Sequence, residues 1–80
     1  MNYTTTDTAL AAYLIASGYP LSGIDYSGPR YEFLFDTSNQ IRADADAYLT
    51  GQALVNPSAY SRINKKLMRI IRRQIQWEDD

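Results

Sequence analysis

The 80-residue chain contains neither cysteine nor histidine, and these two absences exclude several kinds of chemistry. Without cysteine there is no disulfide and no thiolate that binds a metal or attacks a substrate. Without histidine the commonest general base and the commonest zinc-binding side chain are missing. The sequence therefore predicts a non-enzymatic protein with no metal site and no cofactor.

Long apolar runs are absent as well. No stretch approaches the roughly 20 apolar residues that span a bilayer. The first ten residues, MNYTTTDTAL, lack the basic and apolar regions of a signal peptide. We therefore expect no membrane contact and a cytoplasmic location. The composition, 45% apolar and 21% charged, is typical of one small domain covering residues 1–80.

The charges that are present are unevenly distributed. The chain has 8 Lys and Arg against 9 Asp and Glu, yet six of the cations lie in residues 62–75, RINKKLMRIIRRQI, which contain no acid. Residues 1–57 contain two Arg and six acids. Acids are unfavourable at the negative end of a helix, so residues 78–80, EDD, are expected to form a frayed acidic tail or to contact the cations of the same or a neighbouring molecule. This asymmetry is the strongest global feature of the sequence.

The first half of the chain predicts one helix followed by two strands. Residues 4–17 fit a helix that a Thr at position 4, 5 or 6 caps, and Gly18 fits its end. Residues 21–36 contain two alternating apolar patterns. Between these patterns, residues 27–30, SGPR, predict a turn.

The second half predicts two helices. Residues 37–51 fit a helix in which Thr37 and Gln40 have capping-box spacing. A longer helix is predicted to begin with Asn56 as its cap and Pro57 at its first position. It is expected to run to about residue 76, which gives a length of roughly 30 Å.

Together these elements predict an α+β fold, a two-stranded antiparallel hairpin packed with three helices in the order αββαα. The periodicity of apolar residues predicts a core to which every element contributes. Its members should include Leu10, Tyr13, Leu14, Ile24, Phe33, Phe35, Ile41, Leu49, Ile63, Leu67 and Ile70.

Six cations fall on one side of the last helix. At about 100° per residue they fit an arc of about 120°, and the apolar residues of that helix occupy the opposite arc. We expect the apolar side to pack on the rest of the domain and the cations to face outwards. They are Arg62, Lys65, Lys66, Arg69, Arg72 and Arg73.

Three interpretations of this cationic face remain open at the level of sequence. It is a solvated face that acids elsewhere in the chain partly neutralise, a surface for nucleic-acid phosphates, or a surface for an acidic protein. Like charges one turn apart repel by a few tenths of a kcal/mol, and a helix that needed only solubility would mix signs.

Two further groups of residues are candidates for binding. Arg30 lies between Tyr26 and Tyr31 in the predicted turn, and aromatic rings beside an Arg can stack on bases, although tyrosines in a small hairpin more often pack on a core. Asp25, Glu32 and Asp36 lie on or beside the two strands. A metal-dependent nuclease would need such acids to converge beside a Lys, and residues 18–41 contain none, which favours solvated carboxylates.

Three stretches of the sequence resemble a known family. TTDTALAAYLIASGYPLSGID, RYEFLFDTS and AYLTGQALVNPSAYSRINKKLMRIIR are similar to a family of short domains of unknown function that are scattered in phage and bacterial genomes. The shared pattern is Thr-x-Asp before an AAYL-type helix, a Gly near its end, an F-x-F-D-type strand and a closing helix that starts with Pro. The resemblance covers most of residues 5–73.

This resemblance implies a single compact domain from a phage or another mobile element, with no established activity and no catalytic residue. We expect an accessory protein that binds nucleic acid through its basic last helix, in the host cytoplasm if it is phage-encoded. The alternative is a protein-interaction module, either a phage inhibitor of a host protein or a virion component, that uses the same cations on an acidic partner.

Overall fold

A three-stranded antiparallel sheet and three helices make up residues 2–77, the part of the chain that our computed structural model describes. The α+β class is confirmed, but the predicted two-stranded hairpin and the order αββαα are wrong, because the observed order is βαββαα. Residues 78–80, predicted to fray, lie outside the described residues. The elements are β1 (Asn2–Thr5), α1 (Thr8–Ala16), β2 (Leu21–Asp25), β3 (Glu32–Asp36), α2 (Asn39–Leu49) and α3 (Pro57–Arg73).

The strand that the sequence did not predict is β1. It pairs with β3 in a register that places Tyr3 opposite Phe35 and Thr5 opposite Phe33, so β3 is the central strand of the order β1-β3-β2. β1 has only four residues, and its partner lies far along the chain. No local turn signal marks such a pairing, so the local sequence predicts helix caps at these threonines and no strand.

The residues that cap the first two helices also differ from the prediction. Asp7 caps α1, and its carboxylate accepts a hydrogen bond from the backbone N–H of Ala9 at 2.9 Å. Ser38, and not Thr37, caps α2, with its hydroxyl accepting from the N–H of Ile41 at 3.1 Å. Each cap satisfies a backbone donor that the first turn of a helix leaves without a partner.

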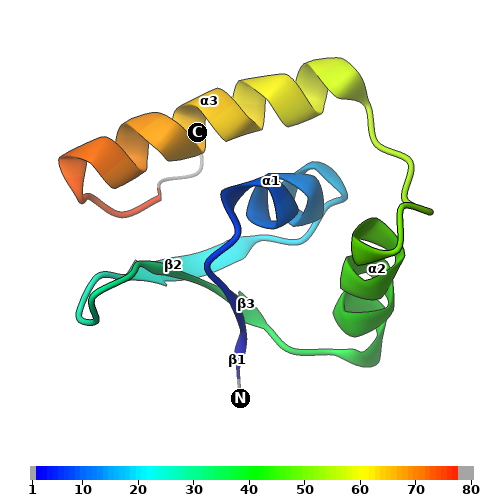
Figure 1. The fold of residues 1–80 in the computed structure, drawn as a ribbon, viewed down its shortest axis with the longest axis horizontal. Coiled ribbons are helices and arrows are strands. Elements are labelled where there is room, and N and C mark those ends of the chain that lie inside the picture. Colours follow the sequence, from blue (N-terminus) through cyan, green and yellow to red (C-terminus); the bar gives the residue numbers. More distant parts are fainter. Residues whose placement is uncertain (1, 78–80) are drawn as a thin grey trace.

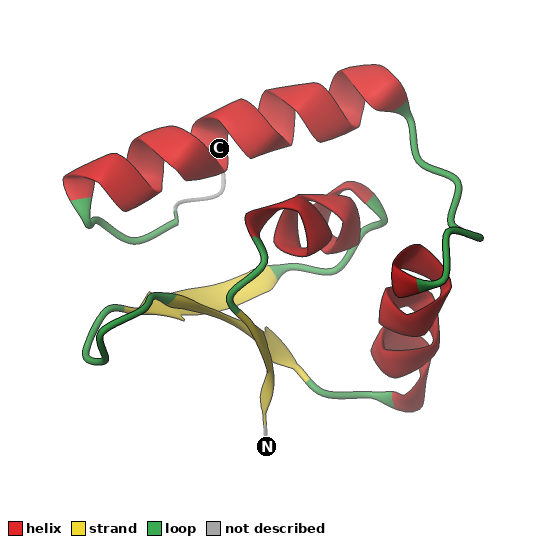
Figure 2. Cartoon of the chain, viewed as in Figure 1, coloured by secondary structure: helices red, strands yellow, loops and turns green. Residues whose placement is uncertain are grey.

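The central element of the fold is α1, which lies between the sheet and α3 (Figure 1). All five residues from position 10 to 14 are buried, which requires cover on more than one side of the helix. α2 packs against α1 as well, at the end of the molecule opposite the turn between β2 and β3 (Figure 2). α3 is therefore the outermost layer on the helical side of the molecule.

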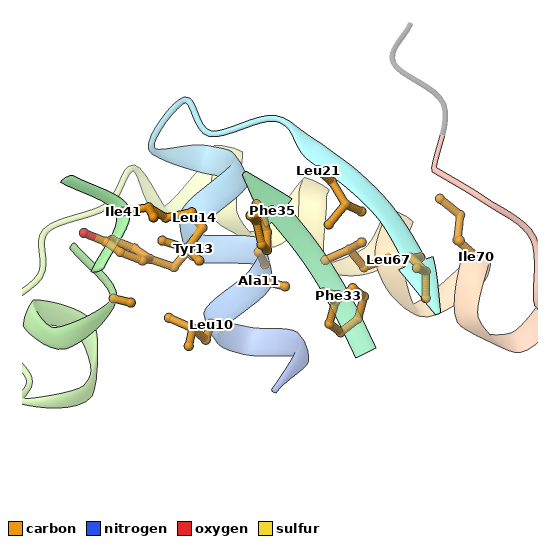
Figure 3. Packing of buried hydrophobic residues seen from close by; sticks show 13 residues of the cluster. Leu10, Ala11, Tyr13, Leu14, Leu21, Phe33, Phe35, Ile41, Leu67 and Ile70 are labelled. Carbon is orange, nitrogen blue, oxygen red and sulfur yellow. The ribbon is translucent and has the colours of Figure 1, made fainter. Parts of the chain in front are cut away.

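The core fills the space between α1, the sheet and α3 (Figure 3). Phe33 and Phe35 point from β3 into this space and are fully buried. Two predicted core residues differ, because Leu49 is 64% exposed and Ile63 is only half-buried. Four residues absent from the predicted core are also buried. These are Ala11, Ala12, Leu21 and Ala45.

The start of α3 confirms the prediction and can be tested by mutation. Asn56 Oδ1 accepts a hydrogen bond from the N–H of Ala59 at 3.1 Å, and Pro57 occupies the first helical position. Asn56→Ala is expected to lower the free energy of unfolding by about 1 kcal/mol, because that N–H loses its acceptor. Chemical denaturation measures the change, with Ser58→Ala, at an exposed site, as the control. Equal midpoints for wild type and Asn56→Ala would contradict this assignment.

The end of α3 differs from the prediction, because the helix stops at Arg73 and not near residue 76. Gln74 takes the left-handed conformation, with φ 53°, and the chain then turns back beneath the helix (Figure 1). This turn brings the carboxamide of Gln76 to the free edge of β2. There it accepts from the N–H of Ile24 and donates to its C=O, both at 2.8 Å, as a neighbouring strand would.

Gln76→Ala should release this C-terminal segment from β2. The loss of two partly exposed hydrogen bonds is expected to cost about 1 kcal/mol, because water replaces part of each. Trp77 is the only tryptophan, so its fluorescence emission should shift to longer wavelength as the ring becomes more hydrated. Gln52→Ala, an exposed glutamine in the loop after α2, is the control. Unchanged emission and stability would show that the segment does not depend on Gln76.

Candidate nucleic-acid interface

The orientation of α3 is set by its apolar side. Leu67 and Ile70 are buried, while Ile63 and Ile71 are partly buried and pack against the core. These residues recur every three or four positions, so they lie on the same side of the helix. Because α1 and the sheet lie on that side, the opposite side of α3 faces away from the molecule (Figure 1).

Five of the six predicted cations lie on this outer side and are exposed. Within residues 2–77 none of the five forms an ion pair with an Asp or Glu. The acids of the first two-thirds of the described chain therefore do not neutralise them by direct contact. We call these five residues the basic strip. Its members are Arg62, Lys65, Arg69, Arg72 and Arg73.

Lys66 corrects the prediction that all six cations face outwards together. Its side chain is half-buried, and its Nζ lies 4.2 Å from the centre of the Trp77 ring. A cation at this distance is attracted to the negative face of the ring, by about 0.5–1 kcal/mol at an exposed site. Lys66 therefore holds the C-terminal segment against α3. No local pattern predicts this contact, because it depends on the chain reversal at Gln74.

The macrodipole of α3 accounts for only part of the basic strip. Arg72 and Arg73 lie in the last turn, where positive charge stabilises a helix. Arg62 and Lys65 lie in the first half of the helix and gain nothing from this effect. Among Arg62, Lys65 and Arg69, like charges three and four residues apart repel one another. Repulsion within the strip therefore lowers the stability of the folded domain.

The surface of the strip is open, and the stems of its long side chains contribute apolar area between the charged groups. A shallow hollow runs between its side chains, and every residue that lines it belongs to α3, including Arg62, Lys65 and Arg69. Met68, which also lines this hollow, is 40% exposed and supplies an apolar contact among the cations. Asn64 lines it too and is half-buried. Neither Met68 nor Asn64 is among the predicted site residues, which are all cations. Their positions beside the strip depend on how α3 is rotated against the core.

Arg30, the remaining candidate, is exposed in the turn between β2 and β3 and lies outside the basic strip. The two tyrosines beside it have partners within the domain. Tyr26 donates its hydroxyl to the C=O of Ile75 at 2.6 Å, and Tyr31 lies 3.2 Å, oxygen to oxygen, from the hydroxyl of Thr8. Both rings also pack against the core. The structure therefore favours the core interpretation of these tyrosines over base stacking.

The acids of the sheet do not form a metal site within residues 2–77, where no three carboxylates come close enough to hold an ion. Asp25 instead accepts from the hydroxyl and the backbone N–H of Ser27, and these hydrogen bonds lower the pKa of Asp25. Asp44 accepts from the hydroxyl of Tyr19, which raises the pKa of Tyr19 to about 12. Tyr19 thus keeps its proton at neutral pH and is a poor base or nucleophile.

Among the helices of residues 2–77, none has both the length and the apolar character needed to cross a bilayer. Comparison with family models, with curated proteins and with solved structures found no match to this chain. The resemblance to short phage and bacterial domains therefore stays a prediction.

Proposed function

We propose that the protein is a non-enzymatic accessory protein that binds nucleic acid through the basic strip. One observation carries this proposal, namely that five exposed cations share the outer side of the outermost helix and contact no acid within residues 2–77. Cations placed in this way neutralise phosphates and release the ions condensed around them, which drives binding. The strip's own repulsion is also relieved when phosphates approach it.

A phage-type role in the host cytoplasm accords with the resemblance noted above and belongs to the same proposal. The second candidate is an acidic protein partner, such as a host protein that is inhibited or a neighbour in a virion. Met68 favours this candidate, because it is 40% exposed within the strip and methionine is enriched in protein interfaces.

Fluorescence anisotropy with labelled oligonucleotides tests the proposal. Wild-type protein should bind at about 50 mM salt and weaken steeply at higher salt. Lys65→Ala/Arg69→Ala should weaken binding to every sequence and flatten the log–log salt dependence by roughly two units. Arg42→Ala is the matched control, because Arg42 is an exposed cation on α2, outside the strip.

The proposal would be overturned by a wild-type protein that binds no nucleic acid at about 50 mM salt. Equal losses in Lys65→Ala/Arg69→Ala and in Arg42→Ala would also contradict it, because binding would then reflect net charge and not the strip. Binding to an acidic polypeptide such as polyglutamate, without binding to nucleic acid, would favour the protein-partner candidate.

A further inference from the structure

Every aromatic side chain of this protein is buried or partly buried in contact with the core. The chain has 7 Tyr, 2 Phe and 1 Trp. Tyr13 and both phenylalanines are buried, and the other seven rings are partly buried and pack against the core. Tyr60, the one aromatic residue within α3, packs against the core as well. None of these rings belongs to the basic strip, and the ring of Trp77, which lies against α3, is already covered by the ammonium group of Lys66.

This absence bears on the kind of nucleic acid that the strip binds. Proteins that bind single strands combine a positively charged groove with exposed aromatic rings on which successive bases stack. On the strip, the hollow between Arg62, Lys65 and Arg69 is lined by α3 alone. A smaller hollow beside Arg69 and Arg73 is bordered by Ile75 from the segment after the helix. Both hollows are open, and no aromatic ring of residues 2–77 lines either of them.

The basic strip has the shape of a ridge. Its members extend from Arg62 to Arg73 along a single outer helix (Figure 1), a distance of about 16 Å at 1.5 Å per residue. A ridge of this kind needs a ligand that supplies the groove. The major groove of B-form DNA is about 12 Å wide and admits an α-helix, whereas that of A-form RNA is deep and narrow.

The distribution of charge around the ridge suits a groove with phosphates on both sides. At about 100° per residue the strip covers an arc of about 100°. Arg72 and Lys65 lie toward one border of this arc, and Arg62 and Arg73 lie toward the other. Both walls of a major groove carry phosphates, at one charge per about 1.7 Å of duplex axis, so cations on both borders would find partners.

We infer that the ligand of the basic strip is duplex DNA, with α3 lying in its major groove. This inference rests on the proposed function and adds to it the class of nucleic acid. Single-stranded DNA and duplex RNA also carry phosphates, but the strip lacks the rings and the enclosing groove for the first. In the second, the major groove is too narrow to admit α3 and the wide minor groove is too shallow to hold it.

Anisotropy with three labelled ligands of one sequence tests the inference at about 50 mM salt. The ligands are duplex DNA, one of its single strands, and the corresponding duplex RNA. Duplex DNA should bind at least about tenfold more tightly than either of the others. Replacing Ser61 by Trp, at an exposed site beside the strip, should strengthen binding of the single strand selectively by supplying a stacking ring.

The outcomes separate this inference from the proposed function. Equal affinity for the three ligands, or tighter binding of the single strand or the duplex RNA, would overturn the inference while leaving nucleic-acid binding in place. No binding to any of the three would overturn both. Preference for duplex DNA in wild type and in Arg42→Ala alike would support the inference.

Discussion

The triple variant Lys65→Glu/Arg69→Glu/Arg72→Glu is expected to lose at least about a hundredfold in affinity for nucleic acid and to keep its fold. Three attractive contacts with phosphates become repulsive, so the loss should exceed that of the corresponding alanine variants. All three side chains are exposed. Lys66 is left unchanged, because its ammonium group lies over the Trp77 ring and its replacement would disturb the C-terminal segment.

The stability of this variant should change little. Relief of repulsion along the strip favours the helix, while Glu at position 72 opposes the helix dipole, and each effect is below about 1 kcal/mol. Circular dichroism and chemical denaturation check the fold, and Arg42→Glu serves as the charge-reversal control on α2. Affinity equal to that of wild type in the folded triple variant would mean that the strip is only a solvated face.

Leu67→Ala is expected to have the largest effect on stability, a loss of about 2–5 kcal/mol, because it leaves a cavity in a close-packed core. Leu67 is fully buried, and Figure 3 places it between α3 and the sheet. A small domain of this length is stabilised by only about 4–12 kcal/mol, so much of its stability would be lost. Urea denaturation with a comparison of midpoints measures the change.

The neighbouring residue provides the control for this prediction. Met68 directly follows Leu67 in α3 but is 40% exposed. Met68→Ala should therefore lower the free energy of unfolding by less than about 0.5 kcal/mol. The contrast tests the rotation of α3, on which the outward position of the basic strip depends. Similar losses for Leu67→Ala and Met68→Ala would show that α3 is rotated and that the strip does not face outwards as described.

The sequence predicted α3 well because its signals are local. The Asn56 cap, Pro57 and the apolar period lie within the helix itself, and the structure confirms the start of the helix and the burial of Leu67 and Ile70. The same apolar period predicts the exposed positions of five cations on the other side of the helix. The candidate site could thus be located from sequence, because one amphipathic helix carries it.

The features that the sequence missed depend on contacts between distant residues. β1 is held by its pairing with β3, and α1 and β2 separate these two strands in the sequence. The four residues of β1 alone therefore contain no pattern that predicts a strand. The contact of Lys66 with Trp77 needs the left-handed Gln74.

Leu49 fits the apolar stripe of α2, yet it is 64% exposed, while its neighbour Tyr48 packs against the Tyr13 ring. The periodicity of apolar residues predicts which side of a helix faces the core. It does not predict which positions on that side the rest of the domain covers.

The salt dependence of the affinity for duplex DNA is the most direct test of the central claim, that the basic strip binds phosphates. If all five cations of the strip contact phosphates, the log–log slope should be about −4.5, a loss of roughly 500-fold between about 50 and 200 mM salt. A slope near zero, or no binding at the lower concentration, would contradict the claim.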